Sequence, residues 1–177
     1  LLIEDLGDDL FARVMEADPK LEEPLYAASV DVLVHLHQAR TPDLPRYDAD
    51  IMTDRATLAY DWYQRGVTGR VNSSEREAFA AAFHTCLEPL DSVMPVLIQR
   101  DYHAENLIWL PERKGVRKVG LLDYQDAMLG HPAYDLVSIV QDARRDVPTP
   151  MGAAMIARYT DATHVDTAQF QKAFALL

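Results

Sequence analysis

Residues 96–146 read VLIQRDYHAENLIWLPERKGVRKVGLLDYQDAMLGHPAYDLVSIVQDARRD. Three short apolar runs divide this segment: Val96–Ile98, Leu107–Leu110 and Val119–Leu122. Apolar runs of this length, separated by turn-forming and ionisable residues, are typical of short buried strands. The turn Pro111–Gly115 lies between the second and third runs. The pattern therefore predicts a β-hairpin, with loops rich in ionisable groups on either side of its first strand.

Polar residues gather in the two loops that flank the middle strand, Arg100–Asn106 and Asp123–Asp126. Phosphoryl transfer needs a carboxylate for the proton of the attacking hydroxyl and oxygen ligands that hold magnesium against the phosphates. Asp101 and Asn106 have the spacing of a kinase catalytic loop, and Asp123 ends the following hairpin strand, where a second metal ligand is expected. That spacing alone also occurs in ordinary turns. The full order of strands and loops makes the kinase interpretation far more specific.

The segment 96–146 resembles the catalytic core of the aminoglycoside phosphotransferase and choline kinase superfamily, whose fold is that of protein kinases. The resemblance implies that ATP and Mg²⁺ are the cofactors. It also implies that Asp101 is the catalytic base and that Asn106 and Asp123 are the magnesium ligands. On the same grounds Asp135 is expected to be a buried carboxylate that braces the catalytic loop by accepting backbone hydrogen bonds.

Further details of the resemblance narrow the subclass. His103 matches the histidine that often follows the catalytic Asp by two residues, and we expect it to support the loop. The sequences Arg100–Tyr102, Leu122–Ala127 and Tyr134–Leu136 are most similar to bacterial sugar kinases of cell-wall recycling, which phosphorylate the anomeric hydroxyl of N-acetylmuramate and N-acetylglucosamine. The resemblance therefore implies a sugar or amino sugar as acceptor. An aminoglycoside or choline is the alternative acceptor, which the net acidity favours.

The start of the chain resembles the last N-lobe strand and the hinge of a kinase. In this reading residues 1–8 form that strand and hinge, where the backbone groups of Glu4 and Leu6 would meet the adenine edge. Residues 9–177 would form the C-terminal lobe. Both ends of the chain read as internal to a longer protein.

The sequence also departs from the family pattern. Gln99 stands where the family usually has a histidine, two residues before the catalytic Asp. A Gly-x-Gly loop and a strand lysine, which cover the phosphates and pair with them, do not precede the catalytic segment. The isolated chain is therefore expected to be inactive. A non-catalytic, pseudokinase-like binding module is an alternative function.

Helical periodicity dominates the rest of the chain. We expect helices at residues 10–15, 24–40 and 49–65, then from 74, around 136–140 and from 149. Ser74 and Glu77 have capping-box spacing, Gly66 is expected to end the third helix, and Thr149-Pro150 reads as a cap followed by proline. Helices, a small sheet and helices again predict an α+β, mostly helical chain: the C-terminal lobe of a protein-kinase-like fold with a small β-hairpin region carrying the catalytic loops.

The composition bounds the function. A formal net charge of -11 disfavours binding to nucleic acid or anionic lipid, because both need a basic footprint. The 49% apolar content predicts a globular chain. An apolar run long enough to cross a membrane and a secretory signal are both missing from the sequence. We therefore expect a cytoplasmic protein that binds a small molecule, with no nucleic-acid or membrane partner; its oligomeric state is left open.

Several residues have both a functional and a structural interpretation. Glu105 and Asp126 are candidate substrate contacts, with an exposed loop acid and a turn-stabilising acid as the alternatives. Tyr60, Trp62 and Tyr63 are candidates for stacking on a sugar ring, although helical aromatics more often pack against a core.

For other residues the structural interpretation is the stronger one. His35 and His37 resemble a metal pair, but residues two apart on a helix do not share a face, so we expect surface or half-buried side chains. Cys86 is expected to be a small core residue. The charged run 142–146 is expected to be a solvated helix end.

Overall fold

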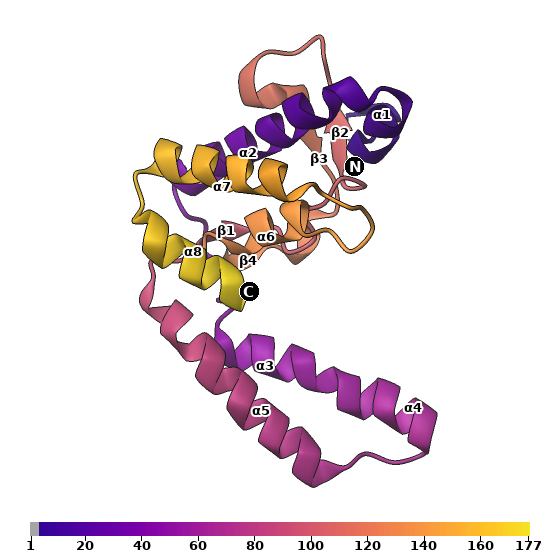
Figure 1. The fold of residues 1–177 in the computed structure, drawn as a ribbon, viewed down its shortest axis with the longest axis vertical. Helices are drawn as coiled ribbons and strands as arrows, with labels where there is room; N and C mark the ends of the chain where they lie inside the picture. Colours follow the sequence, from indigo (N-terminus) through magenta and orange to yellow (C-terminus); the bar gives the residue numbers. More distant parts are fainter. Residues whose placement is uncertain (1–3) are drawn as a thin grey trace.

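A computed structural model describes residues 4–177 as a helical core with two small antiparallel sheets and a projecting pair of helices (Figure 1). Strand β1 (Val96–Ile98) pairs with β4 (Met128–Gly130), and β2 (Leu107–Trp109) pairs with β3 (Val119–Leu121). The prediction of a mostly helical α+β chain with a short hairpin is therefore confirmed.

The pairing of β1 with β4 was not predicted from the sequence. Val96 faces Gly130 and Ile98 faces Met128 across this sheet. A Cβ added at Gly130 would lie 2.5 Å from the Cδ1 atom of Ile98, so the buried Ile98 side chain would have to shift to admit one. This sheet pairs the strand before the first polar loop with the strand after the second polar loop, which brings the two loops onto the same part of the molecule.

The core helices pack around one large apolar cluster. They are α1 (Phe11–Ala17), α2 (Glu22–Gln38), α6 (Tyr134–Val140), α7 (Thr149–Thr163) and α8 (Thr167–Leu176). Leu25 and Leu33 of α2, Leu136 of α6 and Tyr159 of α7 are almost completely buried in this cluster. Within residues 4–177, no helix has the length and apolar character needed to cross a lipid bilayer.

Several predicted element boundaries are wrong. Residues 4–7 carry no strand, and residues 1–3 of that expected strand lie outside the described part of the chain. Thr149 is the first residue of α7 and not its cap, because Pro148 occupies the cap position and the helix has no side-chain cap.

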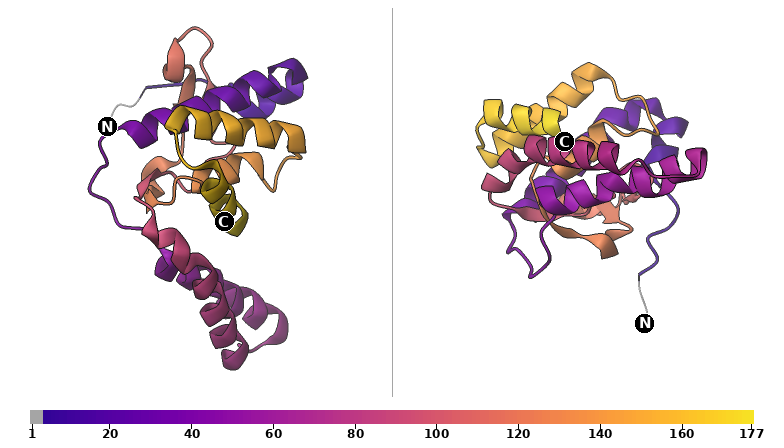
Figure 2. Two further views of the ribbon diagram at one scale, coloured as in Figure 1. Left: turned by 60° about the vertical axis from the view of Figure 1, so that its left-hand side comes forward. Right: turned by 90° about the horizontal axis from the view of Figure 1, so that it is seen from below.

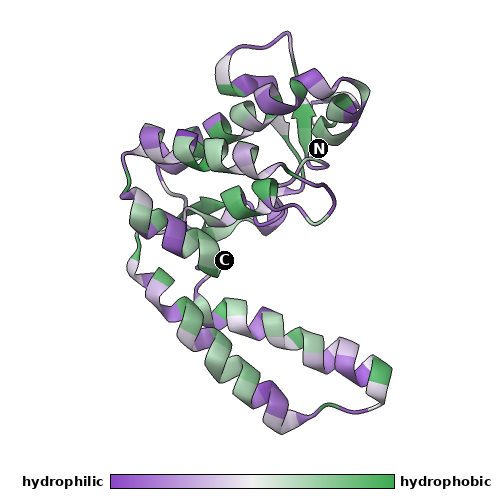
Figure 3. Cartoon of the chain, in the orientation of Figure 1, coloured by the Kyte–Doolittle hydropathy of each residue, from purple (hydrophilic) through white to green (hydrophobic). Residues whose placement is uncertain are grey.

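The remaining long helices form an arm that projects from the core, as the two rotated views of Figure 2 show. The arm runs through α3 (Ala49–Leu58), a π-helical turn (Ala59–Gln64), α4 (Arg65–Thr68) and α5 (Ser73–Leu87). Figure 3 shows hydrophilic and hydrophobic residues mixed along both long arm helices. Few arm residues are fully buried, because each arm helix is covered only on the face that packs against the other arm helix.

Side-chain caps define the ends of the arm helices. Asp48 caps α3 by accepting from the Ile51 amide at 3.1 Å. The cap of α5 is Asn72, which accepts from the Glu75 amide at 3.3 Å. The predicted cap, Ser74, instead donates its hydroxyl to Asn72. The first arm segment ends at Thr68 rather than near Gly66, because Gly69 takes the left-handed conformation that terminates helices.

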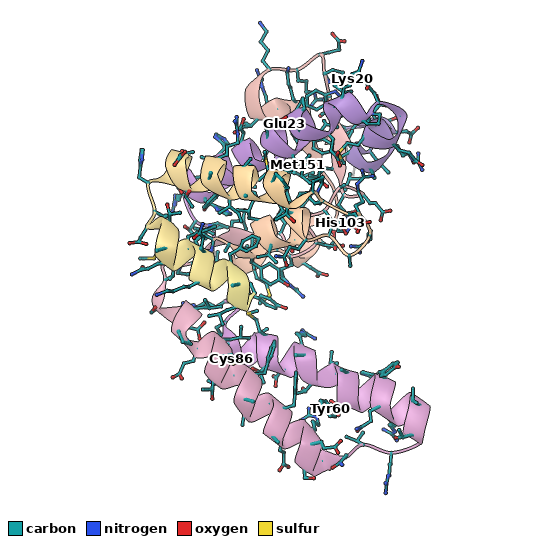
Figure 4. All side chains as sticks on the ribbon, viewed as in Figure 1. Lys20, Glu23, Tyr60, Cys86, His103 and Met151 are labelled. Atoms are coloured by element: carbon teal, nitrogen blue, oxygen red, sulfur yellow. The ribbon has the colours of Figure 1, made fainter. Side chains whose placement is uncertain are left out.

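The arm also corrects two expectations about buried side chains. Cys86, which lies on α5 of the arm (Figure 4), is exposed and not a core residue. Trp62 and Tyr63 are 76% and 75% exposed, so the packing interpretation is wrong for them, whereas Tyr60 packs against Phe79. The π-helical turn shifts the helical register here, and such turns are frequent at functional sites.

Two half-buried histidines make the stability of the fold depend on pH, and His37 has the half-buried side chain that was predicted for it. The Nδ1 atom of His37 lies 2.7 Å from the Tyr159 hydroxyl, and His131 Nδ1 accepts from the Ala133 amide. Burial lowers the pKa of His37 and of His131 to about 4. Between pH 6.5 and 4 the unfolded chain therefore binds protons that the folded chain does not, and the free energy of unfolding falls as the pH falls through this window.

Replacing His37 with Gln should make this acid destabilisation shallower, by at most about 1.4 kcal/mol per pH unit, because one titrating group is removed. Urea unfolding of the wild type and the variant at pH 7.5, 6.0 and 5.0 measures the slope. His35→Gln, at an exposed position on the same helix, is the matched control. Parallel slopes for the wild type and His37→Gln would contradict the prediction.

Candidate active site

The catalytic loop, residues 100–106, is anchored to a buried carboxylate of α6. Asp135 is completely buried, and its two oxygens accept hydrogen bonds from the backbone amides of Gln99 at 2.7 Å and Arg100 at 3.0 Å. Burial raises the pKa of Asp135 to about 7, while the two amide donors act in the opposite direction by favouring the carboxylate. Arg100 itself adopts φ 72°, an uncommon conformation for a residue with a side chain. The anchor therefore fixes the turn that presents Asp101.

Asp101, His103 and Asn106 form one hydrogen-bonded group. His103 is buried, and its Nδ1 atom accepts from the Glu105 amide at 3.3 Å, which assigns the ring hydrogen to Nε2. That Nε2 lies 3.0 Å from Asp101 Oδ1. Asn106 Nδ2 donates to Asp101 Oδ2 and to the Asp101 carbonyl, each at 3.0 Å. Both carboxylate oxygens of Asp101 are thus oriented, while the side chain is 53% exposed and open to a ligand.

The hairpin places Asp123 at the same end of the sheet as Asn106. The Leu122 amide donates to the Asn106 carbonyl at 3.0 Å, which extends the pairing of β2 and β3 by one step. Asp123 follows directly, with φ 51°, and leads into a 3₁₀ turn over Tyr124–Asp126. The left-handed conformation of Asp123 ends the strand and leaves its side chain exposed.

The chemistry of these residues fits a magnesium ion. Asn106 uses its amide nitrogen on Asp101, so its Oδ1 oxygen faces no competing donor among residues 4–177, and Asp123 adds an exposed carboxylate. Mg²⁺ is commonly held by one or two side-chain oxygens together with water and substrate phosphates. Within the described residues, three or more His, Cys, Asp or Glu side chains do not gather as a metal cluster. The Oδ1 oxygen of Asn106 and the carboxylate of Asp123 are side-chain oxygens in this region that could hold such an ion.

Arg100 ties the two polar loops together, a role that the sequence analysis missed. Its guanidinium lies 4.7 Å from the ring centroid of Tyr47, and its NH1 donates to the Asp126 carbonyl at 3.3 Å. Tyr47 directly precedes Asp48, the cap of the first arm helix. Arg100 thus contacts the turn after Asp123 and the base of the arm. The Asp126 side chain, a predicted substrate contact, is exposed.

The charged run after α6 does not match its predicted role as a solvated helix end. The Asp142 side chain is fully buried, and its Oδ1 accepts from the Arg144 amide at 3.0 Å and from Arg144 NH1 at 3.3 Å. Arg144 Nε lies 3.4 Å from Glu105 Oε2, so the other predicted substrate contact lies beside this run. Asp142 lies in the loop after α6, so no helical periodicity in the sequence indicated its burial.

Residues 4–9 run along the hairpin. Glu4 pairs with Arg113 in the turn between β2 and β3, and the Trp109 amide donates to the Asp9 carbonyl at 2.8 Å. Gly120 of β3 lies against the Leu6 side chain, since an added Cβ would be 2.8 Å from Leu6 Cδ1. The two residues predicted to meet adenine therefore lie beside the strands of the hairpin whose other end carries Asn106 and Asp123.

Figure 4 shows His103 at the side of the core, beside the loop that joins α6 to α7.

Comparison with known proteins finds a family model, described as the phosphotransferase enzyme family, that matches residues 1–171. The N-acetylmuramate/N-acetylglucosamine kinase of Caulobacter vibrioides is 42% identical over 171 residues, which cover 91% of this chain and 47% of the relative. The kinase of the same name from Neisseria meningitidis serogroup B is 32% identical over 147 residues, covering 81% of this chain and 42% of the relative. The chain spans about half the length of these curated relatives.

Solved structures share the fold. The ADP-bound aminoglycoside phosphotransferase APH(2'')-Ib superimposes with a TM-score of 0.61 at 12% identity, covering 99% of this chain and 58% of that one. The gentamicin complex of APH(2'')-IIa gives a TM-score of 0.60 at 15% identity, covering 96% and 58%. At this level of identity the likeness concerns the fold alone.

Proposed function

Because the chain belongs to the phosphotransferase enzyme family, we propose that it carries the catalytic loop, the magnesium ligands and the acceptor site of a small-molecule kinase that uses ATP and Mg²⁺. Residues 9–177 would be its C-terminal lobe, and Glu4 and Leu6 would lie in the hinge that meets adenine. The observation that carries the proposal is the oriented carboxylate of Asp101, held by His103 and Asn106 yet open to solvent.

In this mechanism Asp101 accepts the proton of the acceptor hydroxyl as the oxygen attacks the transferred phosphoryl group. His103 Nε2 and Asn106 Nδ2 hold the carboxylate so that the hydroxyl meets it in one geometry, which lowers the entropic part of the barrier. The Oδ1 atom of Asn106 and the Asp123 carboxylate would hold Mg²⁺. When bound, this ion offsets the negative charge of the phosphate oxygens.

The acceptor that we propose is an N-acetylated amino sugar of the kind named for the relatives, N-acetylmuramate or N-acetylglucosamine. Identity to those kinases reaches 42% and covers most of the chain, whereas the structurally similar aminoglycoside phosphotransferases are only 12–15% identical. A net charge of -11 also suits a cationic aminoglycoside, so that class is the comparison to test. ATP as the donor places the proposed reaction in the cytoplasm.

A substrate panel tests the proposal in the complete protein that carries this sequence. With ATP and Mg²⁺, we expect ADP release with N-acetylmuramate and N-acetylglucosamine that far exceeds release with an aminoglycoside or choline. Chelation of the metal with EDTA should abolish this turnover, because the ion that Asn106 and Asp123 would hold supplies the positive charge that offsets the phosphate oxygens. Turnover with aminoglycosides alone would contradict the sugar assignment.

Thermal unfolding separates the enzyme from a non-catalytic binding module. ATP should raise the melting temperature of the complete protein more in the presence of Mg²⁺ than in its absence, because ligands that bind only the folded state stabilise it. A protein without turnover and without magnesium-dependent stabilisation would fit the binding module and not the kinase.

A further inference from the structure

An open pocket of about 240 Å³ adjoins the catalytic loop, on the side of α6 and the loop that follows it. Its lining includes Asp101 and His103 from the catalytic loop, and Ser138, Gln141, Asp142 and Arg144 from α6 and its following loop. The candidate base and a guanidinium thus line one polar hollow. The mechanism above assigns no role to the residues on the α6 side of this pocket.

The Arg144 side chain is held in place by two carboxylates. Its NH1 contacts Asp142, whose side chain is fully buried, and its Nε lies 3.4 Å from Glu105. The arginine side chain is nevertheless 50% exposed. Among residues 4–177, its NH2 nitrogen makes no hydrogen bond, whereas NH1 bonds to Asp142. The guanidinium is therefore oriented in advance, and one edge of it is left with unused donors.

The two carboxylates differ in how strongly they bind the Arg144 side chain. Asp142 is out of solvent and accepts from both the backbone amide and the side chain of Arg144, so this contact is a built-in support. The Glu105 side chain is 54% exposed and its contact is long, so this ion pair contributes little and can be exchanged for another anion. The chain as a whole has a net charge of -11. An oriented, half-exposed guanidinium beside the catalytic loop is therefore a specific site at which a ligand carboxylate can bind.

We propose that Arg144 binds the carboxylate of an acidic amino sugar and thereby determines how well the enzyme accepts it relative to a neutral one. This inference rests on the function proposed above. N-acetylmuramate carries a lactyl carboxylate that N-acetylglucosamine lacks, and the two sugars otherwise share the same ring and acetamido group. They are thus a matched pair of acceptors that differ at the group Arg144 would recognise.

The test is the ratio of kcat/KM for N-acetylmuramate to kcat/KM for N-acetylglucosamine, measured in the complete protein. Arg144→Met should lower this ratio by roughly 10- to 100-fold, because a hydrogen bond to a charged group is lost from one substrate only. Arg144→Lys should lower it less, since a point charge remains without the planar fork. Both sugars are assayed on the same preparation, so the ratio is independent of the fraction of enzyme that is folded.

Two further variants sharpen the test. Arg13→Met, an exposed arginine on α1, makes the same charge change elsewhere and should leave the ratio as it is. Glu105→Gln removes the exchangeable anion and should lower the KM for N-acetylmuramate more than that for N-acetylglucosamine. An unchanged ratio in Arg144→Met, with the wild type active on both sugars, would overturn this inference alone, as would a wild type that phosphorylates N-acetylglucosamine but not N-acetylmuramate. Failure of the wild type to phosphorylate either sugar would overturn the proposed function and the inference with it.

Discussion

Replacing Asp101 with Asn should lower kcat by roughly 10²- to 10⁴-fold, the usual contribution of a positioned general base. Asn has nearly the same shape and still offers one oxygen to His103 or to Asn106, but it cannot take the proton of the acceptor hydroxyl. The loop should therefore persist while proton transfer fails. Steady-state turnover of the complete protein with ATP, Mg²⁺ and N-acetylglucosamine measures the loss.

Nucleotide binding provides the control within the same variant. The dissociation constant of ATP, measured by calorimetry in the presence of Mg²⁺, should change little, because the proposed magnesium ligands Asn106 and Asp123 are retained. Asp43→Asn, at an exposed loop position, has the same change of charge and should keep wild-type turnover. Wild-type kcat in Asp101→Asn would refute the assignment of the base.

Of the substitutions proposed here, Asp135→Ala should lower the free energy of unfolding most. It leaves the buried amide of Gln99 and the amide of Arg100 without acceptors. Each unsatisfied group costs about 1–3 kcal/mol, so the sum is a substantial part of the 5–15 kcal/mol that usually stabilises a domain. Urea unfolding at pH 7.5 measures the change. The kcat of the folded variant should also fall, since the turn that presents Asp101 loses its anchor.

Matched substitutions distinguish this anchor from an ordinary acidic residue. Asp135→Asn keeps the volume and one acceptor oxygen, so its loss of stability should be smaller than that of the alanine variant. Asp31→Ala removes the partner of Arg158 in a surface ion pair and should cost about 1 kcal/mol or less. A urea midpoint for Asp135→Ala as close to the wild type as that of Asp31→Ala would show that the buried carboxylate is not an anchor.

The strands and loops of residues 96–146 were predictable because their signals are local. The three apolar runs have the length of buried strands, and Pro111–Gly115 is a turn sequence, so β1, β2 and β3 form where expected. The spacing of Asp101 and Asn106 let us expect them together, and the structure joins their side chains by a hydrogen bond. By contrast, β4 was missed, since a strand of three residues that ends on a glycine is too short to show a periodicity of its own.

Burial and exposure were decided by packing between distant segments. Asp142 read as a solvated charge because charged residues are rarely buried, yet the fold covers it and places Arg144 on it. Cys86, Trp62 and Tyr63 read as packed residues, yet they lie on an arm whose outer surface nothing covers within residues 4–177. Arg100 contacts Tyr47, which is more than fifty residues away in the chain.

The sequence by itself thus determined the kind of chemistry: a carboxylate, an amide and a second carboxylate carried by a strand hairpin. Short-range backbone preferences and side-chain chemistry are properties of a segment, so they can be read from it. Only the tertiary structure decided which charged groups face the pocket, because a side chain is buried, paired or left open by elements that arrive from elsewhere in the chain. The free edge of Arg144 beside Asp101 is a result of that packing.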